Sequence, residues 1–137
     1  MNSIVEFLER NNFEHFEPLK ADEIDCVQKE VGYTFPQEYL EWMCYSNGGQ
    51  GEINNNYIDL WPIEDVRDFY EDCNLYERFT YVIFASDGCG MGYAFSKSTD
   101  EIFFIPLDSL NNKSAKKCAD SFTQLFDLLA TDNLCEY

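Results

Sequence analysis

Basic side chains are scarce in this chain. Nine Lys and Arg stand against 26 Asp and Glu in 137 residues, and the formal net charge is −17. Nucleic acids and anionic lipids are bound through Lys and Arg that neutralise phosphate, so this composition excludes both as expected partners. A basic protein would instead be attracted and steered towards the surface. The alternative is that the acidic excess only keeps a small domain soluble.

Histidine is almost absent, which limits the catalytic chemistry that the chain can support. The single histidine, His15, lies in a loop-like stretch between Phe13 and Phe16. Mechanisms that pair Ser or Cys with His would all depend on this residue. A histidine among aromatic residues is more often a packed or surface residue than a base. We therefore expect no catalytic residue and no enzyme activity.

Long apolar runs and paired cysteine motifs are also missing. No stretch approaches the ~18 continuous apolar residues that a membrane helix requires, and polar residues interrupt the first turns where a signal peptide would be apolar. The six cysteines include no C-x-x-C pair, so neither zinc nor redox chemistry is indicated. Cys26, Cys44 and Cys73 fall in helix-like patterns, where cysteine usually acts as a small buried hydrophobe. We expect a cytoplasmic protein with reduced thiols, no membrane association, no metal and no cofactor.

The chain does contain enough apolar surface for a core, and we expect one domain over residues 1–137. Hydrophobic residues make up 45% of the sequence and aromatic residues 17%, which excludes disorder despite the charge. Helices are predicted where apolar residues recur at helical spacing. The expected stripes are Ile4, Val5 and Leu8, then Ile24, Val27 and Val31, then Tyr39, Leu40, Met43 and Cys44, then Ile63, Val66, Tyr70 and Cys73, and finally Phe122, Leu125, Phe126 and Leu129.

Helix ends are marked by residues with special backbone preferences. A capping box over residues 3–6 is expected to open the first helix, and Gly32 to close the second. Pro36 is expected as the first residue of the third helix, because its fixed φ suits that position. Asp120 or Ser121 is expected to cap the last helix.

Strands are predicted in the middle of the chain. Residues 81–85, 92–95 and 101–105 are rich in β-branched and aromatic side chains and form a predicted antiparallel meander. Residues 53–60 fit a strand, or a loop or hairpin tip at 54–56, and residues 111–117 fit a basic surface loop. The pattern predicts an α+β single domain whose mainly antiparallel central sheet is covered by helices.

The most crowded acidic segment follows Trp61 and Pro62. Its predicted helix carries Glu64, Asp65, Asp68, Glu71 and Asp72 opposite the apolar stripe, with Arg67 within one turn of Glu64 and Glu71. Residues 31–80 hold ten acidic and two basic side chains, whereas residues 111–137 hold four and three. The acidic helix is either a solvated outer face or a face that meets a basic partner.

The glycine-rich segment 88–92 holds the one candidate nucleophile, Cys89. The segment is not G-x-S-x-G, lacks the lysine of a P-loop, and is followed by a predicted strand rather than a helix. We interpret it as a hairpin turn, and a reactive exposed Cys89 is the enzymatic alternative.

Three segments together resemble the SUKH superfamily, the Smi/Knr-type family of cell-wall assembly regulators and immunity proteins. They are residues 24–49, with their helix started by Pro36 and ended by Asn47-Gly48-Gly49, residues 84–105 with their Ser-Asp-Gly turn, and the closing amphipathic helix near Ser121. The resemblance extends over about residues 18–129. Cys89 and the acidic helix depart from the family pattern.

The resemblance implies a SUKH-like domain that binds proteins and has no enzyme activity. In bacteria such a protein is an immunity factor that neutralises a cognate toxin domain, frequently a nuclease, and a nuclease surface is cationic because it holds phosphates. The alternative is a regulatory or scaffold module of the cell-wall assembly type. Trp61 is equally suited to a core position. The predicted partner-binding residues are Tyr57 and Trp61 as aromatic anchors, and Asp59, Glu64, Asp68, Glu71, Asp72 and Asp87 as charges.

Overall fold

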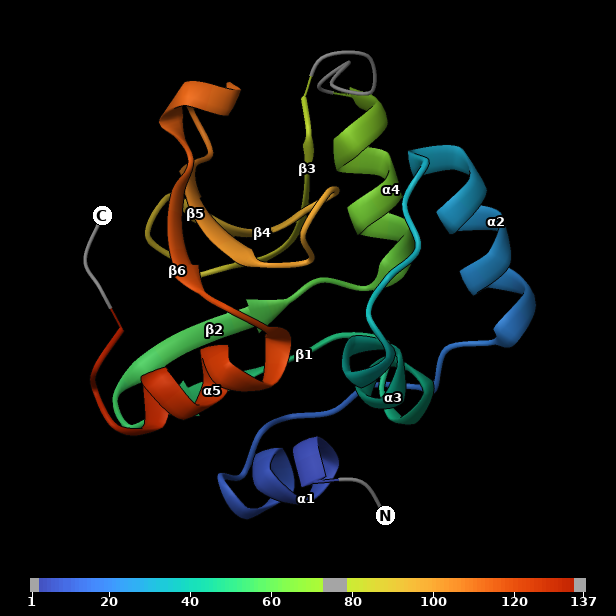
Figure 1. Ribbon diagram of the computed structural model, residues 1–137. Coiled ribbons are helices and arrows are strands. Elements are labelled where there is room, and N and C mark those ends of the chain that lie inside the picture. The colour runs from blue at the N-terminus through green and yellow to red at the C-terminus, as the bar shows by residue number, and fades with distance from the viewer. Residues whose placement is uncertain (1–2, 73–78, 135–137) are drawn as a thin grey trace.

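A computed structural model describes residues 3–72 and 79–134, and within them five α-helices lie against a six-stranded sheet (Figure 1). No helix in these two ranges combines the length and the apolar character needed to cross a membrane. The elements in chain order are α1 (Ser3–Arg10), α2 (Ala21–Val31), α3 (Gln37–Tyr45), β1 (Gly49–Ile53), β2 (Asn56–Leu60), α4 (Ile63–Asp72), β3 (Tyr81–Ser86), β4 (Met91–Ser96), β5 (Ile102–Pro106), a short 3₁₀ turn (Asn112–Ser114), β6 (Lys116–Ala119) and α5 (Phe122–Ala130).

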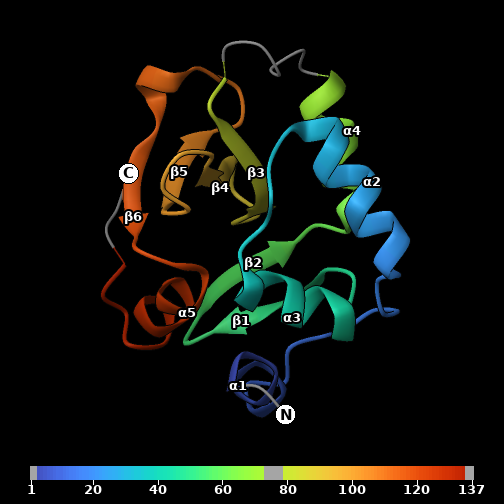
Figure 2. The same ribbon diagram turned by 45° about the vertical axis from the view of Figure 1, so that its right-hand side comes forward.

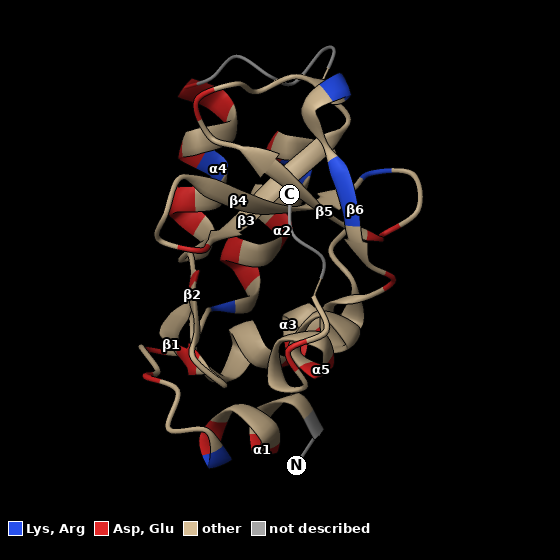
Figure 3. Ribbon diagram, turned by 90° about the vertical axis from the view of Figure 1, so that its left-hand side faces the viewer, with Lys and Arg blue, Asp and Glu red and all other residues tan. Residues whose placement is uncertain are grey.

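The six strands pair in chain order, and every neighbouring pair is antiparallel. The predicted α+β class and the meander of β3, β4 and β5 are therefore confirmed. The sheet is strongly curved, and β1 and β6 lie at its opposite ends (Figures 1 and 3). Asn54 and Asn55, at φ 49° and 69°, join β1 to β2 in a tight turn. Asparagine accepts these left-handed angles, which match the twist of a hairpin, so the hairpin-tip interpretation of the asparagine run is correct.

The two strands at the ends of the sheet were not predicted as strands. β1 contains two glycines and one Glu in five residues, and β6 replaces part of the loop expected over residues 111–117. A strand at the end of a sheet is hydrogen-bonded to a neighbour on one side only. Charged residues are common in such strands because they discourage pairing with other chains, so an end strand does not require a high β propensity. Residues near Glu14 partly cover β1, since the backbone amide of Glu14 donates to the carbonyl oxygen of Gln50 at 2.8 Å.

The helix boundaries agree with the sequence patterns except at one proline. Gly32 closes α2 at φ 68°, and the Ser121 hydroxyl caps α5 by accepting from the amide of Gln124. Pro36 precedes α3 as its cap, with an extended ψ of 149°, and is not the first helical residue as expected. The capping box expected at residues 3–6 depends on the side chain of Ser3. Of Ser3 only the backbone is described, so this expectation stays a prediction.

The main core lies on one face of the sheet and receives side chains from all five helices. The predicted stripes of α1, α2 and α5 are buried as expected, and so are Ile63, Val66 and Tyr70 of α4. Cys73, expected beside them, lies outside the described residues. In α3 the expected stripe is wrong by part of a turn, because fully buried Trp42 takes the place expected for Cys44, which is exposed.

Cysteine burial is the clearest failure of the sequence analysis. Cys26 and Cys44 are exposed although both were expected to be buried, and Cys89 is exposed as its turn suggested. Cys26 lies one residue before Val27 on α2, so it is rotated by about 100° from the buried stripe. Cys118 is buried, and all four of these thiols are free.

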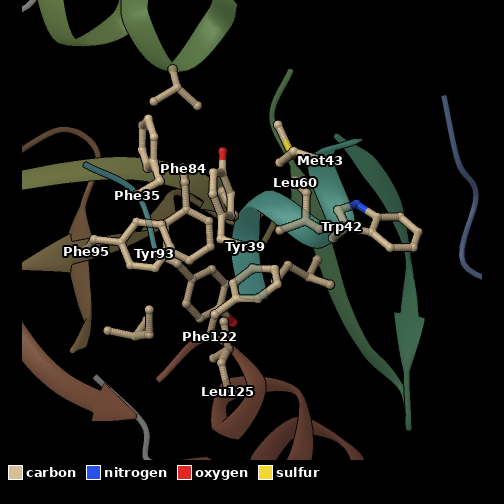
Figure 4. Close-up of a cluster of buried hydrophobic side chains, with 14 of the residues drawn as sticks. Phe35, Tyr39, Trp42, Met43, Leu60, Phe84, Tyr93, Phe95, Phe122 and Leu125 are labelled. Atoms are coloured by element: carbon tan, nitrogen blue, oxygen red, sulfur yellow. The ribbon is translucent and has the colours of Figure 1, made fainter. Parts of the chain in front are cut away.

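Tyr39 lies among Phe35, Phe84 and Phe122 in the middle of this core (Figure 4). Its side chain is fully buried, and its hydroxyl has no hydrogen-bond partner among the described residues. A buried hydroxyl without a partner loses its hydration and gains nothing in return. Tyr39→Phe is therefore expected to raise the free energy of unfolding by about 1 kcal/mol in urea denaturation.

The matched control is Tyr33→Phe. Tyr33 is also buried, but its hydroxyl donates to Asp100 Oδ1 at 2.6 Å. Tyr33→Phe is therefore expected to lower the free energy of unfolding by about 1 kcal/mol. A Tyr39→Phe protein less stable than Tyr33→Phe would contradict the assignment of an unpaired hydroxyl.

Candidate partner-binding face

Helix α4 is held at its N-terminus by Asn47, which follows α3. The side-chain oxygen of Asn47 accepts from the amide of Ile63 at 2.8 Å, and its side-chain nitrogen donates to the Glu64 carboxylate at 3.0 and 3.2 Å. The amide thereby satisfies one of the unpaired N–H groups at the start of the helix. Glu64 is half-buried and turned towards Asn47. The Glu64 carboxylate therefore helps to position helix α4 through Asn47.

Helices α2 and α4 lie side by side (Figures 1 and 2). Lys97, the residue that follows β4, joins them. The Lys97 ammonium donates to the carbonyl oxygen of Val31 at 2.8 Å and lies 4.7 Å from the centre of the Tyr70 ring. A cation at a helix C-terminus satisfies the last carbonyl groups and interacts favourably with the helix dipole. This contact fixes α4 against α2, and therefore fixes the direction in which its outer side chains point.

Three exposed carboxylates, Asp68, Glu71 and Asp72, form what we call the acidic ridge along the outer side of α4. Arg67 relieves part of the like-charge repulsion, as its spacing suggested, because its charge limits the rise in the pKa of Glu71 that Glu30 causes, but its direct ion pairs are with other carboxylates. Its Nε lies 3.0 Å from Asp68 Oδ1 and 3.7 Å from Glu30 Oε2 of α2. These pairs are exposed and contribute little to stability. A hydrogen bond with the Glu30 carboxyl raises the pKa of Glu71, which is what crowded like charges produce.

Strand β2 presents a second set of predicted residues on its outer side. Tyr57 and Asp59 of β2, and Trp61 directly after it, alternate with the fully buried Ile58 and Leu60, because successive side chains of an extended chain point to opposite faces. Tyr57 is 38% exposed, the highest fraction among the large hydrophobic side chains described.

The Tyr57 ring packs on the turn between β3 and β4. A Cβ atom placed on Gly88 would lie only 2.9 Å from this ring, so the position requires glycine. The Tyr57 hydroxyl donates to Gln50 Oε1 at 3.0 Å, which holds the ring against the turn.

The outer sides of β2 and α4 meet in a recess of about 310 Å³. We call it the aromatic recess, and it is lined by Asp59, Trp61, Pro62, Asp65 and Phe69. Trp61 and Phe69 meet edge to face with ring centres 5.1 Å apart, and both side chains are half-buried. Trp61 packs against the main core and against a second, smaller cluster that includes Phe79 and Ile83, so its core interpretation holds in part. It also lines the recess, and its role as a partner anchor stays a prediction.

Asp87 has a structural role in the β3–β4 turn. Its Oδ1 accepts from the amide of Cys89 at 2.7 Å and from that of Met91 at 3.1 Å. The hairpin interpretation of the glycine-rich segment is therefore correct. The carboxylate closes the turn beneath the Tyr57 ring, and whether its remaining charge meets a partner stays a prediction.

The predicted site residues thus fall into three groups. Tyr57, Asp59, Trp61 and Asp87 gather around β2 and the neighbouring turn. Asp68, Glu71 and Asp72 form the acidic ridge on α4, and Glu64 is turned towards Asn47. Asp65 and Phe69 also line the recess, and neither was among the predicted site residues. They are spaced i, i+4, which puts them on one side of α4, and that spacing was the available signal.

The residues considered for catalysis lie in unrelated places. His15 is exposed, with Nδ1 3.3 Å from Glu9 Oε1 and its ring 5.5 Å from that of Tyr45. Cys89 lies in the turn after β3, among residues that are mostly exposed. Over residues 3–72 and 79–134, no three His, Cys, Asp or Glu side chains are grouped so as to hold a metal ion.

Charge is distributed unevenly over the fold. Acidic segments are prominent on α4 and α2, whereas the basic segment around β6 lies on the other side of the molecule (Figure 3). Lys117 in β6 is paired with Glu101 at 2.8 Å and with Asp120 at 2.6 Å, so part of that basic charge is neutralised locally. The acidic ridge and the aromatic recess together form the strongest candidate for a binding face.

Comparison with known proteins places this fold in a family. No curated protein matched the sequence. The model of the SMI1 / KNR4 family (SUKH-1) matches residues 18–128, from the segment before α2 to the last turn of α5. Because that match covers most of the chain, the protein belongs to the SMI1 / KNR4 family (SUKH-1).

Proposed function

We propose that this protein is a cytoplasmic immunity protein, without enzyme activity, that binds and neutralises a basic toxin domain. The observation that supports the proposal is the acidic ridge beside the aromatic recess. Asp68 and Asp72 on the ridge are each three residues from a recess residue, Asp65 and Phe69, so both surfaces share one flank of α4. Carboxylates that attract a partner next to aromatic side chains that anchor it are typical of protein interfaces.

The nature of the partner follows from the charge. An enzyme that cleaves nucleic acid needs a cationic surface to hold phosphates, and an acidic protein that covers this surface blocks the substrate. The family match is compatible with toxin neutralisation and with a regulatory docking role. The concentration of acidic charge in residues 31–80 favours neutralisation of a basic domain.

The proposal is tested by co-expression with a toxin domain from a gene next to the one for this protein, and the absence of any such gene would favour the regulatory alternative. We expect cells that make both proteins to survive, the two to elute together as a complex, and the purified complex to lack toxin activity. Toxin activity that persists in the presence of excess protein would contradict neutralisation. A stable complex with full toxin activity would favour the regulatory alternative.

A further inference from the structure

The aromatic recess differs from the rest of the acidic surface because it is concave and partly apolar. Two aromatic rings and Pro62 form its walls, and one carboxylate from β2 and one from α4 lie among them. Its volume of about 310 Å³ is at the lower end of the range for small-ligand sites. It therefore has room for one side chain of a partner and not for a large cofactor.

The two carboxylates of the recess call for a cation. Neither Asp59 nor Asp65 forms a side-chain hydrogen bond or ion pair with any residue in the part of the chain that the structure describes. Partial burial raises the pKa of Asp59, and the nearby charge of Asp65 raises it further. A cation placed between the two groups would relieve both effects, because it replaces lost hydration and cancels like-charge repulsion.

The aromatic rings make the recess selective for a particular kind of cation. Trp61 and Phe69 are attractive to a positive charge through the negative faces of their π-systems, and tryptophan is the strongest ring in this respect. A guanidinium group is planar, stacks on aromatic rings and forms two parallel hydrogen bonds with a carboxylate. An ammonium group is more strongly hydrated and stacks less well.

We propose that the aromatic recess binds one arginine side chain of the protein partner. Its guanidinium group would have the Trp61 and Phe69 rings on one side and the Asp59 and Asp65 carboxylates on the other. The identity of the partner rests on the proposed function, whereas the capacity of the recess to bind a guanidinium group does not. The acidic ridge then acts at long range to attract the partner, and the recess anchors one residue of it at short range.

The test uses ethylguanidinium as a probe, because it carries the charged end of an arginine side chain. It is titrated into the full-length ¹⁵N-labelled protein while the two tryptophan indole signals are followed by NMR. We expect a saturable shift of the Trp61 signal. Trp42 is an internal control, since it is fully buried and its Nε1 donates to the carbonyl oxygen of Gly48 at 2.9 Å, so its signal is expected to stay in place.

Two further ligands and two variants complete the test. Ethylammonium is expected to bind several-fold more weakly, and uncharged N-ethylurea to give no saturable shift. The variant Asp59→Asn with Asp65→Asn is expected to weaken ethylguanidinium binding about fivefold or more. The matched control, Asp127→Asn with Asp132→Asn, makes the same charge change at exposed positions on and after α5 that do not line the recess, and is expected to stay within about twofold of the parent.

The proposal is overturned if ethylguanidinium gives no saturable shift of the Trp61 signal, if N-ethylurea shifts it equally, or if both double variants weaken binding equally. None of these measurements contains the partner. Binding of ethylguanidinium without protection from the toxin would leave the recess intact and reject the proposed function. Protection without ethylguanidinium binding would do the reverse.

Discussion

Neutralising the acidic ridge is expected to slow association with the proposed toxin partner about tenfold at low ionic strength. The variant carries Asp68→Asn, Glu71→Gln and Asp72→Asn, all at exposed positions of α4. Charges at the rim of an interface act mainly on the association rate, because they steer the approach of the partner and are largely solvated in the complex. The dissociation rate is therefore expected to change much less than the association rate. Stopped-flow mixing or surface-based kinetics measures both.

The control for this variant removes the same charge elsewhere. Glu6→Gln on α1, Asp127→Asn on α5 and Asp132→Asn after it are also at exposed positions, and none of these side chains forms a hydrogen bond or ion pair with another described residue. We expect the control to associate within about twofold of the parent. Equal slowing by the two variants would mean that net charge, and not the ridge, attracts the partner.

Truncating Phe95 is expected to have the largest effect on stability. Phe95 is fully buried and stacks on Phe84 with ring centres 4.2 Å apart, and it also contacts the rings of Tyr39, Tyr33 and Phe35. Phe95→Ala is expected to lower the free energy of unfolding by about 3–5 kcal/mol, because it removes these contacts and leaves a cavity. That is a large part of the total for a domain of this size. Urea denaturation measures the loss.

Phe103→Ala is the matched control for the core. Phe103 lies on the neighbouring strand β5, is half-buried, and contacts Tyr81 with ring centres 5.0 Å apart. Because less apolar surface is buried there, we expect a loss below about 2 kcal/mol. A Phe95→Ala protein no less stable than Phe103→Ala would show that the aromatic cluster does not dominate the core.

The sequence predicted those parts of the fold in which burial and local preference agree. Strand β3 begins with four consecutive β-branched or aromatic residues, and the apolar residues of α5 recur at strict helical spacing, so both elements were predicted. Strands β1 and β6 were missed because pairing with a neighbour, and not their own composition, makes them strands. The rotation of α3 was misjudged because Tyr39, Leu40, Met43 and Cys44 fit a helical stripe as well as Tyr39, Trp42 and Met43 do.

The candidate site was predicted in part for similar reasons. Alternation along a strand brought Tyr57, Asp59 and Trp61 to one face, and that regularity can be inferred from sequence. The contribution of Phe69 depends on how α4 is rotated against β2. That rotation is set by Asn47 and Lys97, both of which lie far from Phe69 in the sequence. Such tertiary contacts leave no local pattern, so the recess became visible only in the folded structure.

Electrostatic attraction is proposed to bring a basic toxin domain to this acidic face. The decisive measurement is the association rate constant of the unaltered protein with that domain, from about 20 mM to about 500 mM NaCl, a range over which the Debye length falls from about 20 Å to about 4 Å. We expect the rate constant to fall tenfold or more across this range. A rate constant that is the same in low and high salt would rule out electrostatic steering.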